Sequence, residues 1–224
     1  MKKYFNFITD EVEIIFPDLI LPKAFNANET PKYGCVILVK KDSAALNQFR
    51  EALAAEAKQA KIQLKSVNTL KSMEAYKIET EQRLSRQLDT EKIDKETYKE
   101  KEQKIIDFAE KYKDYYITKA KTKKKPVLVD RFGKDITDKR LQLNGAVARL
   151  KLVPAYYEGF GGGITLYLEG VQIIKLGTAG GSSEEQIKNE FGVYKGSIQD
   201  ETLENATKPV AKFDEADNGE ELPF

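Results

Sequence analysis

Apolar residues along this chain follow two periods, which predict strands near both ends of its folded part and helices between them. Residues 10–25 are expected to be extended, with bends at Pro17 and Pro22. Residues 33–40 form a short β-branched run, which predicts a core strand. Asp42 and Ser43 then supply an N-cap signal, and the apolar residues that follow at helical spacing predict an amphipathic helix over roughly 44–64.

The segment 71–113 contains no glycine or proline and is dense in lysine and glutamate. Apolar and aromatic residues recur there at helical spacing in two stretches, and residues 88–94 between them offer aspartate and threonine as new helix caps. This pattern predicts a helical hairpin, with one long coiled-coil helix as the alternative. We expect most of its charges to form a solvated face.

Strand patterns return after residue 114. Residues 115–121 and 126–130 flank a lysine cluster, while residues 145–157 and 164–176 surround a Gly-rich turn and predict a β-hairpin with a bulge or bend at Gly170. Residues 182–188 have the composition of a short helix start. The predicted fold is α+β and mainly β, with five or so strands and one substantial helix forming a small closed or partly closed barrel.

Composition removes several classes of chemistry. The chain has 224 residues, no histidine and a single cysteine, Cys35, so histidine-based triads, histidine-ligated zinc and an internal disulfide are excluded. No apolar run is long enough to span a bilayer, and the Met-Lys-Lys start is not followed by a signal-type apolar stretch. We therefore expect a protein of a reducing cytoplasm, without a cofactor, a metal site or a membrane partner.

The net charge of +1 hides a strong asymmetry. Residues 200–224 carry a net charge of −6, which leaves +7 on the rest of the chain, as suits a body that binds a polyanion. The last eleven residues are expected to be mobile, and their terminal ring and α-carboxylate suit capture by a partner; a purely solubilising tail is the alternative. The predicted partner-binding residues are Asp214, Glu215, Asp217, Glu220, Glu221, Leu222, Pro223 and Phe224.

Cations and aromatic rings gather in the C-terminal strand region. Lysines separate two predicted strands, and the neighbouring hairpin adds two cations on one face and three rings near its tip. Single-stranded nucleic acid is held by rings that stack on bases and by cations that follow the backbone. The alternative for the rings is that one or two of them close the end of the barrel. The predicted DNA-binding residues are Lys119, Lys121, Lys123, Lys124, Lys125, Arg149, Lys151, Tyr156, Tyr157 and Phe160.

Several segments resemble the T7-type bacteriophage single-stranded-DNA-binding protein family. They are Asn28–Gly34, Ile117–Asp130, Leu150–Tyr156, Leu166–Leu176 and Ala179–Gly181, together with the acidic tail ending in Phe224. The resemblance implies an oligonucleotide-binding (OB) fold, binding of single strands without sequence specificity, dimerisation, strand annealing and a tail that contacts replication partners. Two features depart from the family: the chain has no tryptophan, and residues 71–113 have no clear counterpart.

These observations predict a phage-type protein of DNA replication, recombination and repair that acts in the host cytoplasm and is not an enzyme. Its expected parts are an OB-fold domain over 1–182 with a helical insertion at about 71–113, a linker over 183–203 and a disordered acidic tail over 204–224. Expected partners are single-stranded DNA, a second copy of the chain, and the replicative DNA polymerase and helicase or primase, through the tail.

Two other functions compete with this one. The first is an interaction adaptor, in which the charged helices are the working surface and the barrel is a scaffold with weak nucleic-acid binding. The second is a magnesium-dependent nuclease using Asp130, Asp135 and Asp138. Aspartate is also the residue expected in polar turns for backbone reasons, which favours the non-catalytic interpretation.

Overall fold

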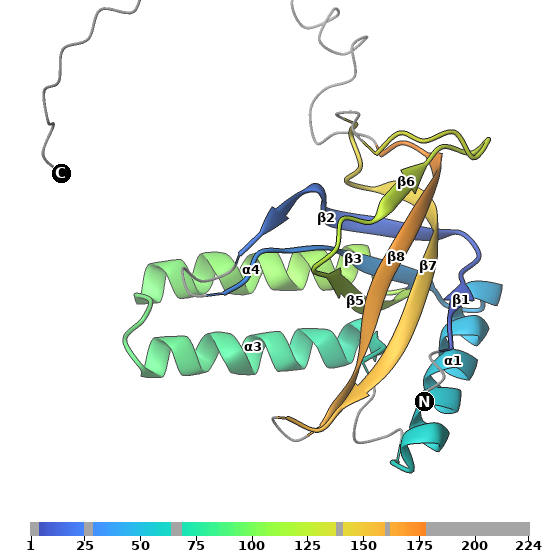
Figure 1. The fold of residues 1–224 in the computed structure, drawn as a ribbon. Coiled ribbons are helices and arrows are strands. Elements are labelled where there is room, and N and C mark those ends of the chain that lie inside the picture. The colour runs from blue at the N-terminus through green and yellow to red at the C-terminus, as the bar shows by residue number, and fades with distance from the viewer. Residues whose placement is uncertain (1–4, 25–28, 64–68, 138–140, 160–161, 178–224) are drawn as a thin grey trace, which may run out of the picture. The chain divides into compact units, whose positions relative to one another are not determined.

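The computed structural model describes residues 5–24, 29–63, 69–137, 141–159 and 162–177, and Figure 1 shows their arrangement. The strands are β1 (Phe7–Ile8), β2 (Val12–Lys23), β3 (Lys32–Lys40), β4 (Lys71–Ser72), β5 (Tyr115–Thr122), β6 (Val127–Val129), β7 (Ala146–Tyr157) and β8 (Gly163–Lys175). The helices are α1 (Ala44–Ala60), α3 (Met73–Asp89) and α4 (Lys95–Lys111).

Five of these strands pair in a closed order. β2 pairs antiparallel with β3, and β3 with β5. β8 runs parallel to β5 and antiparallel to β7, and β7 pairs in turn with β2, so the sequence of pairings returns to its start. The described residues thus form a mixed α+β fold, mainly sheet, with three helices. The OB-fold barrel itself stays a prediction.

Helix α1 covers the main core. Its N-terminus is capped by Ser43, whose Oγ accepts the Leu46 N–H at 3.3 Å, as the sequence predicted. Phe49 and Leu53 on its inner face are buried among residues of the sheet. The helix ends at Ala60, before the expected end near 64, because the chain turns there through a left-handed residue, Lys61, with φ 57°.

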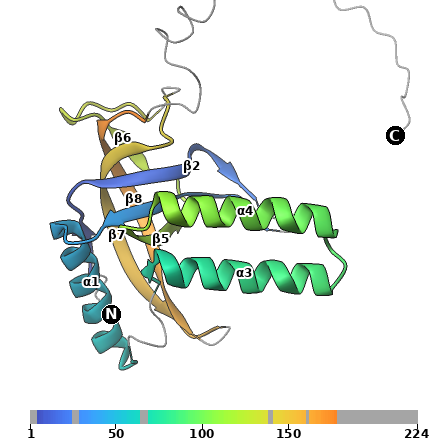
Figure 2. The same cartoon turned by 180° about the vertical axis from the view of Figure 1, so that it is seen from behind.

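The segment 71–113 forms a helical hairpin, and the single long helix was the wrong alternative. Asp94 begins α4 by accepting the Thr97 N–H at 2.7 Å, so the cap lies in the segment where the sequence placed one. A second core joins the hairpin to the outer face of β2, β3 and β5; its buried members are Ile15, Leu38, Met73, Ala109 and Ile117. In Figures 1 and 2 the hairpin projects from one side of the strands and α1 lies at the other.

The long strands β7 and β8 form the predicted β-hairpin. Alternate residues on one face of β7 are all buried: Ala146, Ala148, Leu150 and Leu152. A register shift in the β7–β8 ladder lies next to Gly170, where a bulge or bend was expected. The helix start expected over 182–188 lies outside the described residues. Within the described ranges, no helix has the length and apolar character needed to cross a membrane.

Candidate nucleic-acid interface

Strand β5 and the turn after it carry the lysine cluster. Lys119 and Lys121 alternate with buried Ala120, so both lie on the face of the strand that is directed away from the main core. Lys123, Lys124 and Lys125 follow and are exposed. With Lys32 from β3 and part of β8, these lysines border a groove of about 760 Å³, here named the lysine groove. Its lining residues are Lys32, Lys121, Thr122, Lys123, Lys124, Lys125, Thr165, Tyr167, Leu168 and Glu169.

Tyr167 is an aromatic residue of this groove that the sequence analysis did not select. It is 47% exposed and lies on β8 between the buried Leu166 and Leu168. Side chains alternate between the two faces of a strand, so a ring between two core leucines must point outward. Alternation along β8 therefore predicts from the sequence that Tyr167 points away from the core.

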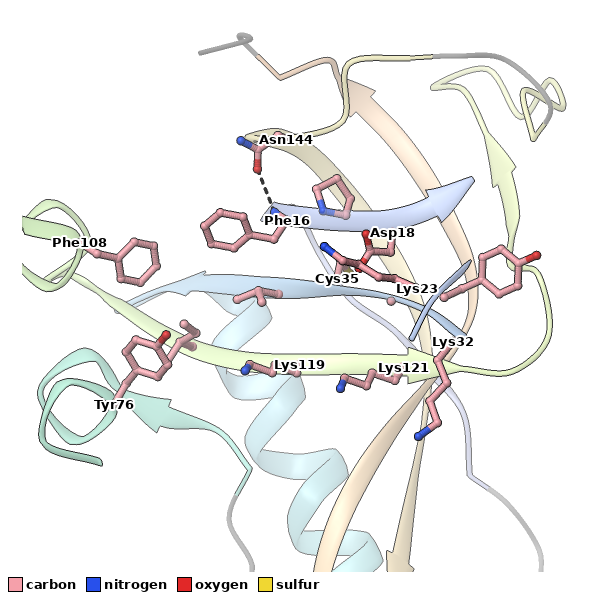
Figure 3. A pocket seen from close by; sticks show the side chains of 15 residues that line it. Phe16, Asp18, Lys23, Lys32, Cys35, Tyr76, Phe108, Lys119, Lys121 and Asn144 are labelled. Atoms are coloured by element: carbon pink, nitrogen blue, oxygen red, sulfur yellow. Dashed lines mark hydrogen bonds between the residues drawn. The ribbon is translucent and has the colours of Figure 1, made fainter. Parts of the chain in front are cut away.

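A second hollow, the aromatic cavity, adjoins the lysine groove. It measures about 530 Å³ and lies between the sheet and the helical hairpin (Figure 3). Its rings are Phe16, Tyr33, Tyr76 and Phe108, and its cations are Lys23, Lys32, Lys119 and Lys121. Lys32 and Lys121 line both hollows, which makes the two one continuous surface.

The charge around Lys119 is strongly positive. Burial lowers the pKa of its ammonium group, and the neighbouring charges of Arg83, Lys121 and Lys71 lower it further, against a weaker opposing effect of Glu79. Lys71 is itself ion-paired with Glu79. Like charges that oppose one another in the free protein are stabilised when an anion binds between them. This part of the surface is therefore suited to phosphate.

Arg149 and Lys151 lie on β7, and both are exposed, but each already has a partner. The Arg149 Nε–H donates to the backbone oxygen of Thr9 at 3.3 Å. Lys151 Nζ lies 2.9 Å from Glu169, a residue of the lysine groove. Lys151 thus reaches the border of the groove through Glu169, which offsets part of its charge.

The predicted rings Tyr156 and Tyr157 lie at the end of the β7–β8 hairpin and line neither hollow. Tyr156 packs against the main core, and its backbone N–H donates to Glu56 at 2.8 Å. Tyr157 is 45% exposed and lies over Gly163. Phe160 and all the predicted tail residues from Asp214 to Phe224 lie outside the described residues.

The aspartates of the nuclease alternative have backbone partners. Asp130 Oδ1 accepts the N–H groups of Phe132 and Lys134, both at 2.9 Å. Asp135 accepts the Thr137 N–H at 2.8 Å, and hydrogen bonds from Thr137 lower its pKa. Asp138 lies outside the described part of the chain, and the part that is described contains no cluster of three or more potential metal ligands.

Most residues of the aromatic cavity carry no signal in the amino-acid sequence that marks them as a site. Tyr76 and Phe108 belong to the helical stripe that predicted the hairpin, and nothing in a helical stripe shows which of its rings line a cavity. Phe16 did carry a signal, because it follows the consecutive apolar residues Ile14 and Ile15 and precedes Pro17, where strand alternation fails.

Known proteins share this architecture. The single-stranded DNA-binding protein from bacteriophage Enc34, in a structure in complex with ssDNA, is 14% identical, with a TM-score of 0.55 over 79% of this chain and 89% of that chain. Another structure of that protein is 13% identical, with a TM-score of 0.51 over 84% and 90%. A single-stranded DNA-binding protein encoded by bacteriophage T7 is 14% identical, with a TM-score of 0.46 over 88% and 100%.

No curated protein matches the sequence significantly. Residues 5–203, however, match the protein family described as Enterobacter phage Enc34, ssDNA-binding protein. This match confirms the resemblance to phage single-stranded-DNA-binding proteins that the segments around the lysine cluster indicated. The chain therefore belongs to the ssDNA-binding protein family of Enterobacter phage Enc34.

Proposed function

We propose that this chain binds single-stranded DNA without sequence specificity, as a replication and recombination protein of a bacteriophage. The observation that carries the proposal is the junction of the lysine groove and the aromatic cavity at Lys32 and Lys121, which joins cations and rings in one surface. A cationic groove follows the backbone of a single strand while rings stack on its bases. Membership of an ssDNA-binding family points to the same ligand.

The proposed interface combines the predicted residues with those found in the structure. Lys119, Lys121, Lys123, Lys124 and Lys125 contact phosphates, and Tyr167 adds a ring. Arg149 and Lys151 extend the cationic surface along β7, with Lys151 leaving Glu169 for a phosphate. Tyr156 and Tyr157 near the end of the β7–β8 hairpin are proposed to contact a longer strand. Phe160, which lies outside the described residues, is proposed as a third ring from the sequence alone. The site binds DNA and catalyses no reaction.

The proposed architecture is an OB fold. Its five strands are β2, β3, β5, β7 and β8, whose pairings close on themselves. OB folds bind oligonucleotides on the face of their second and third strands and on two adjoining loops. Here those strands are β3 and β5, and their outer face carries Val36, Lys119 and Lys121 of the aromatic cavity. The position of the candidate interface thus supports the fold assignment.

The tail is proposed as a regulatory arm. We infer a DNA-binding domain over 1–182, a linker over 183–203 and an acidic tail over 204–224 that competes with DNA for the lysines and presents Phe224 to a replicative polymerase, helicase or primase. Dimerisation and promotion of strand annealing belong to the same proposal, as does action in the host cytoplasm. The charge asymmetry of −6 against +7 supports the competition between tail and DNA.

Fluorescence anisotropy with labelled oligo-dT and a matched duplex tests this function. The full-length chain and a 1–203 truncation are titrated at several salt concentrations. We expect preference for the single strand, a strong salt dependence, and tighter binding by the truncation at low salt. Equal and weak binding to both nucleic acids refutes the proposed function, and unchanged affinity after truncation refutes the competing tail alone.

A further inference from the structure

We propose that the aromatic cavity takes an unpaired nucleobase, stacked on Phe16 and bordered by Tyr76 and Phe108 of the helical hairpin. This inference rests on the proposed function, because it assigns one part of a DNA-binding surface. It gives the hairpin, which has no clear counterpart in the T7-type resemblance, a direct part in binding. The hairpin then acts as a wall of the DNA site, and not as a separate surface for a protein partner.

The rings of the cavity come from elements far apart in the chain. Phe16 belongs to β2, Tyr76 to α3 and Phe108 to α4, and Figure 3 shows their side chains at the same hollow. The ring centroids of Phe16 and Phe108 are 6.4 Å apart with planes inclined by 30°, and those of Tyr76 and Phe108 are 5.9 Å apart. A volume of about 530 Å³ lies within the range of cavities that hold small organic molecules.

Phe16 is held in an unfavourable conformation that exposes its ring. Its φ is 47°, in the left-handed region that bulky residues rarely enter, and its side chain is 64% exposed. The β2–β3 register shifts between Ile15 and Asp18, so Phe16 lies in a bulge that turns its ring away from the regular ladder. The Phe16 N–H donates to Asn144 Oδ1 at 2.8 Å, which fixes this backbone.

This arrangement costs stability in the free protein. A left-handed non-glycine residue costs on the order of 1–3 kcal/mol, and such residues concentrate at binding sites, where the surrounding structure imposes them. The Phe16 ring recovers little of that cost by burial, since most of its surface remains in water. A ligand that stacks on the exposed ring accounts for both the strain and the exposure.

The hairpin supports the cavity rigidly. Phe108 contacts Tyr112 at a centroid distance of 4.9 Å, and Tyr112 contacts Tyr115 of β5 at 5.8 Å. All three rings pack on the second core between hairpin and sheet. Phe108 is therefore positioned before any ligand arrives, so a base binding beside it loses little affinity to ordering of the site.

The charges identify the ligand as part of a nucleic acid. Four lysines line the cavity against the single carboxylate of Asp18. A base entering the cavity carries its phosphate past Lys119 or Lys121, and Lys121 also lines the lysine groove. A duplex cannot offer such a base without unpairing it, so the cavity contributes to preference for single strands.

An oligo-dT with 2-aminopurine at one position reports the stacking directly, since the fluorescence of this base changes when it stacks on a ring. The chain has no tryptophan to interfere with excitation of the probe. The full-length wild type is compared with Phe16→Ala, with the ring-preserving Phe16→Tyr, and with Phe132→Ala as a matched control. Phe132 is another exposed phenylalanine, 82% accessible, and does not line the cavity.

We expect Phe16→Ala to remove most of the fluorescence change at saturating protein and to weaken oligo-dT binding by about ten-fold or more, as loss of one stacked base does. Because stacking involves no counterion release, the slope of log K against log salt stays unchanged. Phe16→Tyr restores the signal, and Phe132→Ala leaves it intact.

If the wild type binds oligo-dT in a salt-dependent way and Phe16→Ala shows the same fluorescence change and the same affinity, the cavity does not take a base. The proposed function is unaffected by that result. Failure of the wild type to prefer single strands overturns the proposed function itself. If Phe16→Ala binds DNA normally but loses binding to a replication protein, the cavity belongs to a protein partner and the inference is wrong. Thermal unfolding of each variant separates these outcomes from misfolding.

Discussion

Replacing Lys119 with glutamine tests the proposed role of this lysine in DNA binding separately from its effect on folding. Its ammonium group is partly desolvated and surrounded by the charges of Arg83, Lys121 and Lys71, which together lower its pKa. Glutamine keeps a polar side chain and removes the charge. The substitution should therefore weaken DNA binding without weakening the fold, a combination that a structural lysine does not show.

The expected loss of affinity follows from one phosphate contact. A hydrogen bond to a charged group contributes about 1.5 kcal/mol or more, so Kd for oligo-dT should rise roughly ten-fold at 50 mM salt. Removing one phosphate interaction makes the slope of log K against log salt shallower by about 0.7 for single strands. Over the four-fold rise in salt from 50 to 200 mM, this difference in slope lowers the ratio of the two Kd values by about 2.5-fold. Lys119→Gln should therefore bind oligo-dT roughly four-fold more weakly than wild type at 200 mM salt.

Whereas Lys119→Gln should weaken DNA binding, it should not lower the free energy of unfolding. Because the pKa of Lys119 is lower in the folded state than in the unfolded chain, the unfolded state binds more protons between the two values, and wild-type stability rises with pH across that window. Lys119→Gln lacks this rise and should be at least as stable as wild type at neutral pH. DNA affinity of the wild type should fall as pH rises through the lowered pKa, because phosphates bind the charged form.

Anisotropy titrations and urea unfolding of the same preparations measure both effects. Lys99→Gln is the matched control, since Lys99 is an exposed lysine of α4 nine residues from Phe108, about 14 Å along the helix axis. It should leave affinity within about two-fold, as expected for an exposed charge that lies about one Debye length away at 50 mM salt and about two at 200 mM. If Lys119→Gln binds DNA as tightly as the control, or unfolds at clearly lower urea, Lys119 serves the fold and the reasoning fails.

Other predictions concern the residues that support the interface. Burial, with a smaller effect of Asp18, raises the pKa of the Cys35 thiol to about 12, so a thiol reagent at pH 8 should label Cys35 only on unfolding; fast labelling of native protein contradicts this. Glu56→Ala leaves the Tyr156 N–H without its acceptor and should lower the free energy of unfolding by about 1–3 kcal/mol, whereas Glu56→Gln keeps an acceptor and should lose less in the same urea titration. A Cβ on Gly34 meets the Ala120 backbone oxygen at 2.5 Å, so Gly34→Ala should separate β3 from β5 and cost about 1–3 kcal/mol; a melting temperature equal to wild type argues against this close approach.

Local signals in the sequence were sufficient for most elements. Ser43 and Asp94 cap helices where the sequence offered caps, and the apolar alternation over 146–152 matches the buried face of β7. Helix caps and apolar periodicity depend on residues close together in the sequence, so they can be recognised without knowledge of the rest of the chain. The predicted end of α1 near residue 64 was too late. Residue 61 takes a left-handed conformation that ends the helix, and a lysine, unlike a glycine, gives no indication of this in the sequence.

Only part of the candidate site could be predicted from such local signals in the sequence. The lysines of 119–125 were visible as a density of like charge, which folding alone does not favour. The cavity beside them was not, since Tyr76 and Phe108 lie in the same helical stripe as Met73 and Tyr112, which belong to the second core and do not line the cavity. The engagement of Lys151 with Glu169 also depends on the β7–β8 register, which no single strand reveals.

Most strands and helices, the order of features that marks the family, and the opposite charges of residues 200–224 and the rest of the chain can be derived from the amino-acid sequence. The position of the helical hairpin beside β3 and β5, which brings Phe16 and Phe108 together next to Lys119 and Lys121, cannot. Periodicity states which residues share a face, whereas the meeting of two faces depends on packing between segments distant in the chain. The proposed binding surface is lined by residues of β2, β3, α3, α4 and β5, so it forms only once those faces are packed together.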